Sequence, residues 1–208
     1  MTPIDSVTLD VSDPAAAERF YANAFDLDAE VRFRASDAPT TSFRGFTLAL
    51  TVAQPSTVDS FVESALAAGA TTLKPAAKSL WGYGGVVQAP DGAIWKVASS
   101  SKKNTGPTVR RIDDLVLLLG VADIVASKRF YVEQGLTVGK SFGRVYVEFA
   151  AGEGPVKLAL YRRRALAKDL GVPSEGTGSH RIVVNGGATF TDPDGFAWTA
   201  RVGQSAER

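Results

Sequence analysis

The sequence contains no cysteine and a single histidine, His180. Without cysteine the chain can form no disulfide, use no thiolate nucleophile and bind no metal through sulfur. Enzymes of small folds that bind metals usually use several histidines and carboxylates, so one histidine leaves few ways to build such a site. His180 stands next to Arg181, and no second ligand follows at a metal-binding spacing. We interpret it as a hydrogen-bonded structural or surface residue, with its role left open.

The sequence also lacks an excess of charge of one sign. Lysine and arginine total 23 and aspartate and glutamate total 22, which gives a formal net charge of +1. This balance does not favour nucleic acid or an anionic membrane as a partner. No apolar run approaches the roughly 20 residues that cross a bilayer, and no signal peptide is visible. We therefore expect a cytoplasmic protein that binds neither nucleic acid nor a membrane.

What the sequence does contain is an internal repeat. Three landmarks occur twice in the same order: a strand-like segment, an Arg-Phe-Tyr triplet, and a Pro-Asp-Gly turn shortly before a tryptophan. In the first copy they are residues 4–11, Arg19-Phe20-Tyr21 and Pro90-Asp91-Gly92 with Trp95; in the second they are residues 112–119, Arg129-Phe130-Tyr131 and Pro193-Asp194-Gly195 with Trp198. The repeat predicts two modules, residues 1–99 and 108–204, joined by a polar linker at 100–107.

Local patterns predict the elements of each module. Apolar residues alternate with polar ones over residues 6–11, which is typical of a strand with one buried face. Ser12 or Asp13 is expected to cap a helix that has Pro14 at its first position. A second amphipathic helix is predicted from Ser56, with Asp59 as its capping-box partner. The second module should gain a strand pair, near residues 144–150 and 156–161, and lack the second helix.

This missing helix has a predicted consequence for the surface. The second module should expose an apolar sheet face unless another element or a second subunit covers it. A homodimer formed through that face is therefore one expected arrangement.

The order of these segments resembles the vicinal-oxygen-chelate superfamily, which includes glyoxalases, bleomycin-resistance proteins and dioxygenases. Further resemblance lies in residues 42–48, 68–75 and 81–85. The resemblance implies an α+β fold of two tandem βαβββ modules, with cupped mixed sheets around a shared cleft. Because this fold hosts both enzymes and binding proteins, the resemblance alone does not define a function.

In the enzymes of that superfamily, the resemblance implies a divalent metal held by the first and last strands of paired modules. These ligand positions fall on Ser6 and Asp114 in the first strands, and on Lys96 and Thr199 in the last strands. Only Asp114 is a usual metal ligand, and the ammonium group of Lys96 would repel a cation. We therefore expect no metal, no cofactor and no assigned catalytic residue. We also expect Lys96 and Asp114 to form an ion pair, with Ser6 and Thr199 completing one polar floor.

The sequence leaves three functions open. The first is a metal-free protein that binds a small aromatic or apolar molecule in the cleft. The second is an enzyme of the superfamily, lyase, isomerase or dioxygenase-like, with an atypical metal site or with acid–base catalysis through Asp114 or Lys96. The third is a structural or interaction module. For binding, the candidate cleft residues are Ser6, Arg44, Trp81, Tyr83, Lys96, Asp114 and Thr199.

Overall fold

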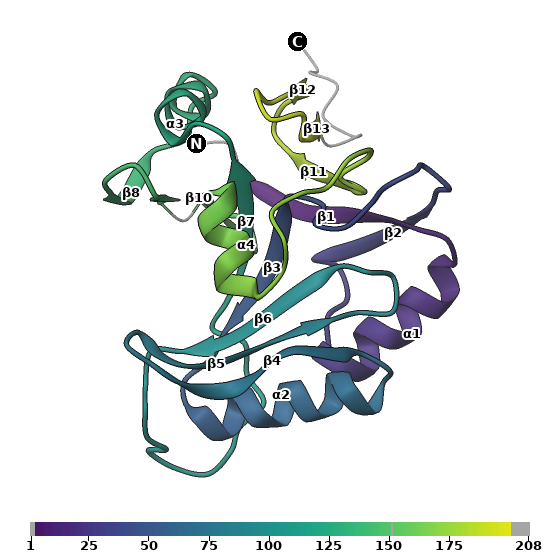
Figure 1. The fold of residues 1–208 in the computed structure, drawn as a ribbon, viewed down its shortest axis with the longest axis vertical. Coiled ribbons are helices and arrows are strands. Elements are labelled where there is room, and N and C mark those ends of the chain that lie inside the picture. Colours follow the sequence, from purple (N-terminus) through teal and green to yellow (C-terminus); the bar gives the residue numbers. More distant parts are fainter. Residues whose placement is uncertain (1–2, 151, 201–208) are drawn as a thin grey trace.

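The computed structural model describes residues 3–150 and 152–200 as an α+β fold (Figure 1). The first half of the chain contains β1 (Ile4–Val11), α1 (Pro14–Phe25), β2 (Val31–Ala35), β3 (Phe46–Thr51), α2 (Pro55–Ala67), β4 (Thr71–Ser79), β5 (Gly82–Gln88) and β6 (Ile94–Ser99). The second half contains β7 (Asp114–Val121), α3 (Ile124–Glu133), β8 (Val138–Phe142), β9 (Tyr146–Phe149), β10 (Val156–Arg162), α4 (Arg163–Leu170), β11 (Ile182–Gly186), β12 (Phe190–Thr191) and β13 (Ala197–Ala200). None of the described helices is long and apolar enough to cross a membrane.

The start of α1 follows from its sequence, whereas the start of α2 does not. The Asp13 carboxylate accepts a hydrogen bond from the Ala16 amide at 2.9 Å, as expected of a capping residue before a first-position proline. At α2 the predicted capping box is absent, since Gln54 is the N-cap and makes no side-chain capping bond. Asp59 instead accepts a hydrogen bond from the Tyr83 hydroxyl on β5 at 2.8 Å. The Asp59 carboxylate therefore makes a tertiary hydrogen bond to β5 in place of the capping bond that the local sequence predicted.

The strands form two complete βαβββ units in the middle of the chain. In one unit, β3 runs parallel to β6, and β5 and β4 follow outward; in the other, β7 runs parallel to β10, and β9 and β8 follow. The units join through antiparallel pairing of β3 with β7. Their eight strands give the order β4-β5-β6-β3-β7-β10-β9-β8, and we call the concave face of this surface the central cup (Figure 1).

Two shortened units occupy the ends of the chain. β1 runs parallel to β2 across α1, and β11 runs parallel to β13, with no helix among the described residues between β11 and β12. β1 pairs antiparallel with β11, which joins the two shortened units into a second surface that we call the terminal cup. Each predicted half thus contributes one complete and one shortened unit. The division at residues 100–107 stays a prediction, and residues 201–204 of the predicted second module lie outside the described part.

The convex side of the sheet carries α1, α2 and α3 and the main hydrophobic core. The sheet face that we expected to be exposed in the second half is covered. Trp198 is 1% exposed and stacks on Phe190, and Tyr131 of α3 packs beside it. Of the outcomes expected for this face, exposure or cover by another element or subunit, the structure shows cover by other elements, α3 and β12.

The repeated tyrosine and tryptophan meet in the core in two similar hydrogen-bond chains, which end on aspartates at different positions: Asp91 within the first Pro-Asp-Gly turn, and Asp192 just before the second. In the first half, the Trp95 indole N–H donates to the Tyr21 hydroxyl at 3.1 Å, and this hydroxyl donates to the Asp91 carboxylate at 2.9 Å. In the second half, Trp198 donates to Tyr131 at 3.2 Å, and Tyr131 donates to Asp192 at 2.7 Å. Each chain ties a helix to the Pro-Asp-Gly turn and to the strand that follows.

Helix α4 lies on the opposite, concave side, where the central cup bends around it (Figure 1). It packs against β7 and β10. Gly120 permits this approach, since a Cβ there would lie 3.3 Å from the Arg163 Cα and 2.8 Å from the Gly45 carbonyl oxygen. The apolar face of α4 forms a small second core with residues of the cup: Phe43, Leu73, Val86, Ile94, Leu118 and Tyr161 against Leu166, Ala167 and Leu170.

Candidate functional site

The floor of the central cup contains two lysines at equivalent positions of its two units. The strand register aligns Lys96 with Ala49, Ala49 with Val116, and Val116 with Lys157, in one row across β6, β3, β7 and β10. Lys96 lies on the last strand of one unit and Lys157 on the last strand of the other, with the Ala49–Val116 pair between them. The row of four strands spans about 14 Å between the outer Cα atoms.

Each lysine pairs with a carboxylate. Lys96 Nζ lies 2.5 Å from Asp169 Oδ2 on α4, and Lys157 Nζ lies 2.5 Å from Asp114 Oδ1 on β7. Asp114 also accepts a hydrogen bond from the Thr51 hydroxyl at 3.3 Å. The predicted Lys96–Asp114 ion pair was therefore wrong, because each residue has a nearer partner of opposite charge. These four side chains are 30–41% exposed, so the polar part of the cup is open to solvent.

The two cups separate residues that we expected on one polar floor. Ser6 of β1 and Thr199 of β13 lie in the terminal cup, where each strand pairs with β11 at Asn185. The Asn185 amide donates to the hydroxyls of Ser6 at 3.1 Å and Thr8 at 2.9 Å. Ser6 and Thr199 therefore do not share the floor with Lys96 and Asp114, since β1 and β13 belong to the other pair of units.

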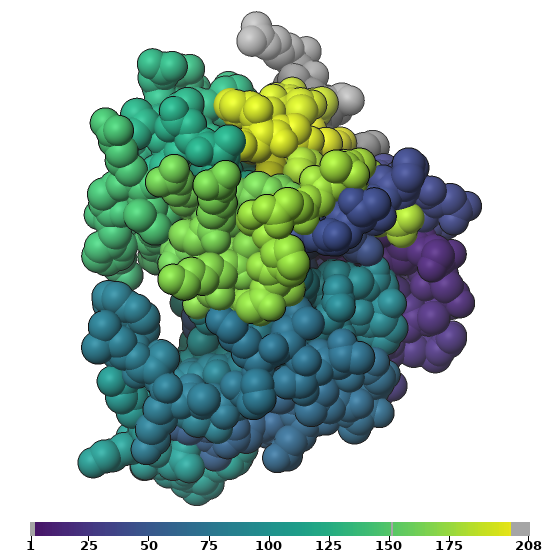
Figure 2. All heavy atoms as spheres, viewed as in Figure 1, coloured from purple at the N-terminus to yellow at the C-terminus, as the bar shows by residue number. Residues whose placement is uncertain are grey.

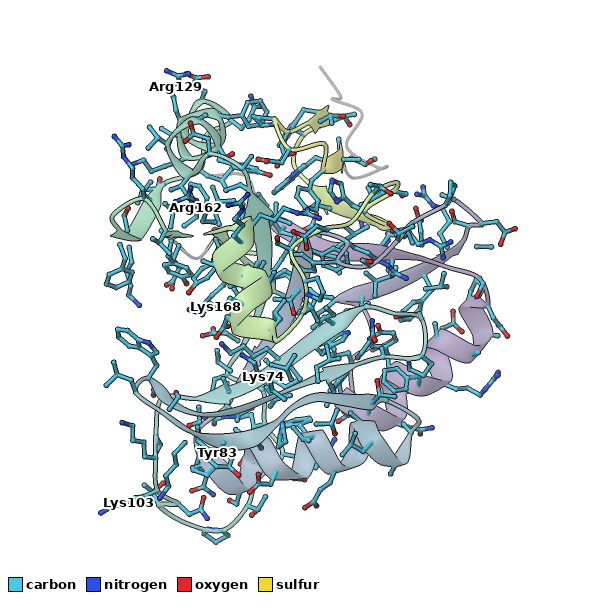
Figure 3. All side chains as sticks on the ribbon, viewed as in Figure 1. Lys74, Tyr83, Lys103, Arg129, Arg162 and Lys168 are labelled. Carbon is cyan, nitrogen blue, oxygen red and sulfur yellow. The ribbon has the colours of Figure 1, made fainter. Side chains whose placement is uncertain are left out.

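The remaining candidate residues lie in three different places. Arg44 donates to the Asp91 carbonyl oxygen at 2.5 Å and so fixes the first Pro-Asp-Gly turn; burial lowers its pKa. Tyr83 is on the side of the sheet that faces α2 (Figure 3), where its hydrogen bond to Asp59 raises the pKa of the phenol. Trp81 is 82% exposed at the tip of the β4–β5 hairpin, and only this one of the three could contact a ligand at the rim of the central cup.

His180 joins the two halves of the chain. Its Nδ1 lies 2.5 Å from the Arg44 carbonyl oxygen, and its Nε2 lies 3.0 Å from the Asp194 carbonyl oxygen. The ring also stacks on Phe196, with the ring centroids 3.9 Å apart. With both nitrogens engaged by backbone oxygens, His180 has a structural position and offers no ring nitrogen to a metal.

The rim of the central cup is apolar and aromatic on both sides. The outermost hairpin of one unit ends in Leu80 and Trp81, which are 79% and 82% exposed, and that of the other ends near Phe142, which is 63% exposed. Figure 2 shows a hollow between the β4–β5 hairpin and α4. Tyr161 lines the cup nearby, and burial together with the Asp169 carboxylate raises its pKa. The cup thus combines a charged floor with an aromatic rim.

A divalent metal does not fit this set of side chains. Lys96 places an ammonium group at a position where the resemblance implies a metal ligand, Lys157 adds a second ammonium group in the same row, and ammonium repels a cation. Asp114, the one usual ligand at the implied positions, is paired with Lys157. In the part of the chain that the structure describes, no three His, Cys, Asp or Glu side chains form a group that could hold a metal ion.

The sequence interpretation missed Lys157 and Asp169. A signal for Lys157 was present, since it alternates with Val156 and Leu158 on a predicted strand and so must face away from the buried side. Asp169 carried no comparable signal, because its role depends on how α4 docks in the cup. Lys74 shows the same dependence, since its ammonium donates to the carbonyl oxygens of Lys168 and Asp169 at the end of α4 (Figure 3).

Comparison with known proteins identifies the fold. No protein-family model matches the chain, and no curated protein sequence matches it. Among solved structures, glyoxalase I from Zea mays superposes with a TM-score of 0.63 at 13% identity, covering 96% of this chain and 92% of that one. A point mutant of the maize enzyme also gives 0.63, at 12% identity and with 96% and 93% covered.

A shorter structure matches half of the chain. It is a glyoxalase/bleomycin resistance protein/dioxygenase family enzyme from Burkholderia phytofirmans, with a TM-score of 0.42, 21% identity, and 47% of this chain and 98% of that one covered. The maize structures are the ones that establish the architecture over nearly the whole chain. This protein has the fold of the vicinal-oxygen-chelate proteins, so the fold expected from the sequence resemblance is confirmed.

Proposed function

We propose that this protein binds a small aromatic molecule in the open part of the central cup, without a metal. The observation that carries the proposal is the exposed Trp81 at the tip of the β4–β5 hairpin, which borders the hollow next to α4 in Figure 2, together with the ion pairs of the cup floor. When a flat ligand stacks on a largely exposed tryptophan, apolar surface of both is removed from water, which favours binding. Lys96 at an implied metal position, with Lys157 in the same row of the floor, supports binding over metal-dependent chemistry.

Fluorescence of an aromatic probe tests this proposal. Trp95 and Trp198 are 0% and 1% exposed, so Trp81 is the one of the three tryptophans that a ligand in the cup can contact. With phenylnaphthylamine, a neutral aromatic probe, we expect a saturable rise in the probe's own emission that chelators do not change. Measured in the same way, Trp81→Ala should weaken binding about tenfold, as expected for the loss of an aromatic contact in a binding site.

The matched control is Phe33→Ala, which removes an aromatic ring that stacks on Tyr21 outside the central cup. It should leave the affinity for the probe unchanged. Absence of saturable binding, or binding that requires an added divalent metal, would contradict the proposed function.

A further inference from the structure

The floor of the cup carries two ammonium groups, each paired with a carboxylate, in place of a set of metal ligands. A metal site concentrates oxygen and nitrogen ligands around a cation. Here the equivalent positions of the two units present ammonium groups, Lys96 and Lys157, in one row across the floor. Both are about one third exposed, at 31% and 30% of the side chain, so their remaining donors are accessible from the cup.

Long side chains can converge above a curved floor. The two lysines are about 14 Å apart at their Cα atoms, and each carries a chain of four methylene groups toward the concave side. Only Ala49 and Val116, one small and one β-branched residue, stand between them in the row. An acidic group of ligand size that enters over this pair therefore meets an ammonium from either side.

Asp169 forms an ion pair with one of these ammonium groups, that of Lys96, and it belongs to α4, which lies outside the sheet. It belongs to the last turn of α4, which connects β10 to β11, and it is 41% exposed. Because half-exposed ion pairs contribute little net stability, an incoming anion can replace such a carboxylate at small cost. The Asp114 carboxylate is bound more firmly, since Thr51 also donates to it.

We propose that the ligand of the central cup carries an acidic group, a carboxylate or sulfonate on an aromatic body, that binds Lys96 and Lys157 and displaces Asp169 from Lys96. This inference rests on the proposed function and adds the charge of the ligand. It assigns the aromatic body to Trp81 at the rim and the anion to the lysine row on the floor.

The test compares two probes that differ in one anionic group. Phenylnaphthylamine is neutral, and its sulfonated analogue anilinonaphthalene sulfonate has the same aromatic body. The sulfonate should bind about tenfold more tightly, and Lys96→Gln or Lys157→Gln should weaken it about fivefold while affecting the neutral probe much less. Lys96→Arg should restore most of the lost affinity because it restores the charge.

A substitution that is expected to strengthen binding, rather than weaken it, gives the sharpest evidence. Asp169→Asn removes the competing carboxylate and should tighten sulfonate binding about threefold. The Arg34–Asp10 ion pair, on β2 and β1 of the terminal cup, supplies matched controls outside the central cup. Asp10→Asn alters the net charge as Asp169→Asn does, and Arg34→Gln alters it as Lys96→Gln does; neither should change sulfonate affinity.

The outcomes separate the two proposals. If neither probe binds, the proposed function fails. If both probes bind equally and the lysine variants change nothing, the cup binds aromatic molecules but the anion inference is overturned. If the control variants shift sulfonate affinity as much as their counterparts, a general surface charge effect replaces the lysine row and the inference is again overturned.

Discussion

At the scale of single residues, one tyrosine hydroxyl in the core of each half makes hydrogen bonds to two neighbouring side chains. The Tyr131 hydroxyl accepts from the Trp198 indole and donates to the Asp192 carboxylate, and its ring is fully buried. Removing the oxygen leaves a buried N–H and a buried carboxylate oxygen without that partner. Unsatisfied buried groups cost more than the net contribution of one hydrogen bond.

Tyr131→Phe is therefore expected to lower the free energy of unfolding by about 2–3 kcal/mol, measured by urea denaturation. The control is Tyr83→Phe, which removes a hydroxyl that donates to the half-buried Asp59 of α2, and should cost about 1 kcal/mol or less. Equal losses in the two variants would contradict the bridging role of Tyr131.

Sequence patterns marked Tyr131 and Trp198 of this network, but neither the acceptor Asp192, which precedes the repeated turn, nor the contacts. The Arg-Phe-Tyr triplet, the Pro-Asp-Gly turn and the tryptophan stand out because each occurs twice at matching places. Their meeting in the core depends on the packing of α1 or α3 on distant strands, since Trp198 lies 67 positions after Tyr131 in the sequence. The same holds for Lys96. Strand alternation predicted which face of the sheet its side chain is on, but it could not predict its partner Asp169, which lies 73 residues away in the sequence.

At the scale of elements, the segment between the two halves is fastened by one side chain. The Gln54 amide donates to the carbonyl oxygens of Gly106 and Pro107, both at 3.0 Å, and its carbonyl oxygen accepts from the Thr105 amide at 2.8 Å. Gln54 is 4% exposed, so it is buried beneath the segment that it fixes. The polar linker expected here from composition stays a prediction, and composition gave no sign that the segment is docked on Gln54.

Gln54→Ala should release this segment and make it easier to cleave. Lys102 and Lys103 are trypsin sites within it, and proteolysis follows local opening of the backbone. We expect cleavage after these lysines to become at least several times faster, measured by mass spectrometry of the fragments over time. Gln88→Ala, which loses a hydrogen bond within the β5–β6 turn, is the control and should leave this rate unchanged.

Among the helices, α4 is the one that local sequence patterns did not predict. It has eight residues, it begins without a side-chain cap, and it follows directly on β10. A short segment of this kind is marginal as an isolated helix. Packing in the cup stabilises it: Leu170 is 0% exposed, and Lys74 binds the carbonyl oxygens at its end. Tertiary contacts therefore decide its conformation.

At the scale of the whole molecule, the halves share one sheet. β1 of the first half pairs with β11 of the second, and β3 pairs with β7. Neither half can unfold without exposing the strand edges of the other. We expect a single cooperative transition in urea, with far-ultraviolet circular dichroism and the fluorescence of Trp95 and Trp198 giving the same midpoint. Two separated transitions would show that the halves are energetically independent.

The five tyrosines predict how the molecule responds to alkali. Burial raises the pKa of Tyr21, Tyr131, Tyr146 and Tyr161, and the hydrogen bond to Asp59 raises that of Tyr83. Because the folded values lie above the unfolded value of about 10, the neutral phenols stabilise the fold below that pH. This contribution is lost as the pH rises through the folded values.

Absorbance at about 295 nm measures tyrosine ionisation directly. The folded protein at a pH slightly above 10 should show far less tyrosinate than the same protein in urea, where the phenols titrate near their ordinary pKa of about 10. Ionisation in the native protein should then accompany alkaline unfolding. Identical titration curves in the two conditions would contradict the raised values.

The position of His180 has a consequence for following the molecule in solution. Its imidazole is unique in the chain, and it touches a backbone oxygen of each half at Arg44 and Asp194. A single set of imidazole resonances therefore reports the closure of the seam between the halves, free from overlap with any other histidine. Two events can therefore be followed separately in solution. Trp81 reports ligand binding in the cup, and His180 reports separation of the two halves at the seam.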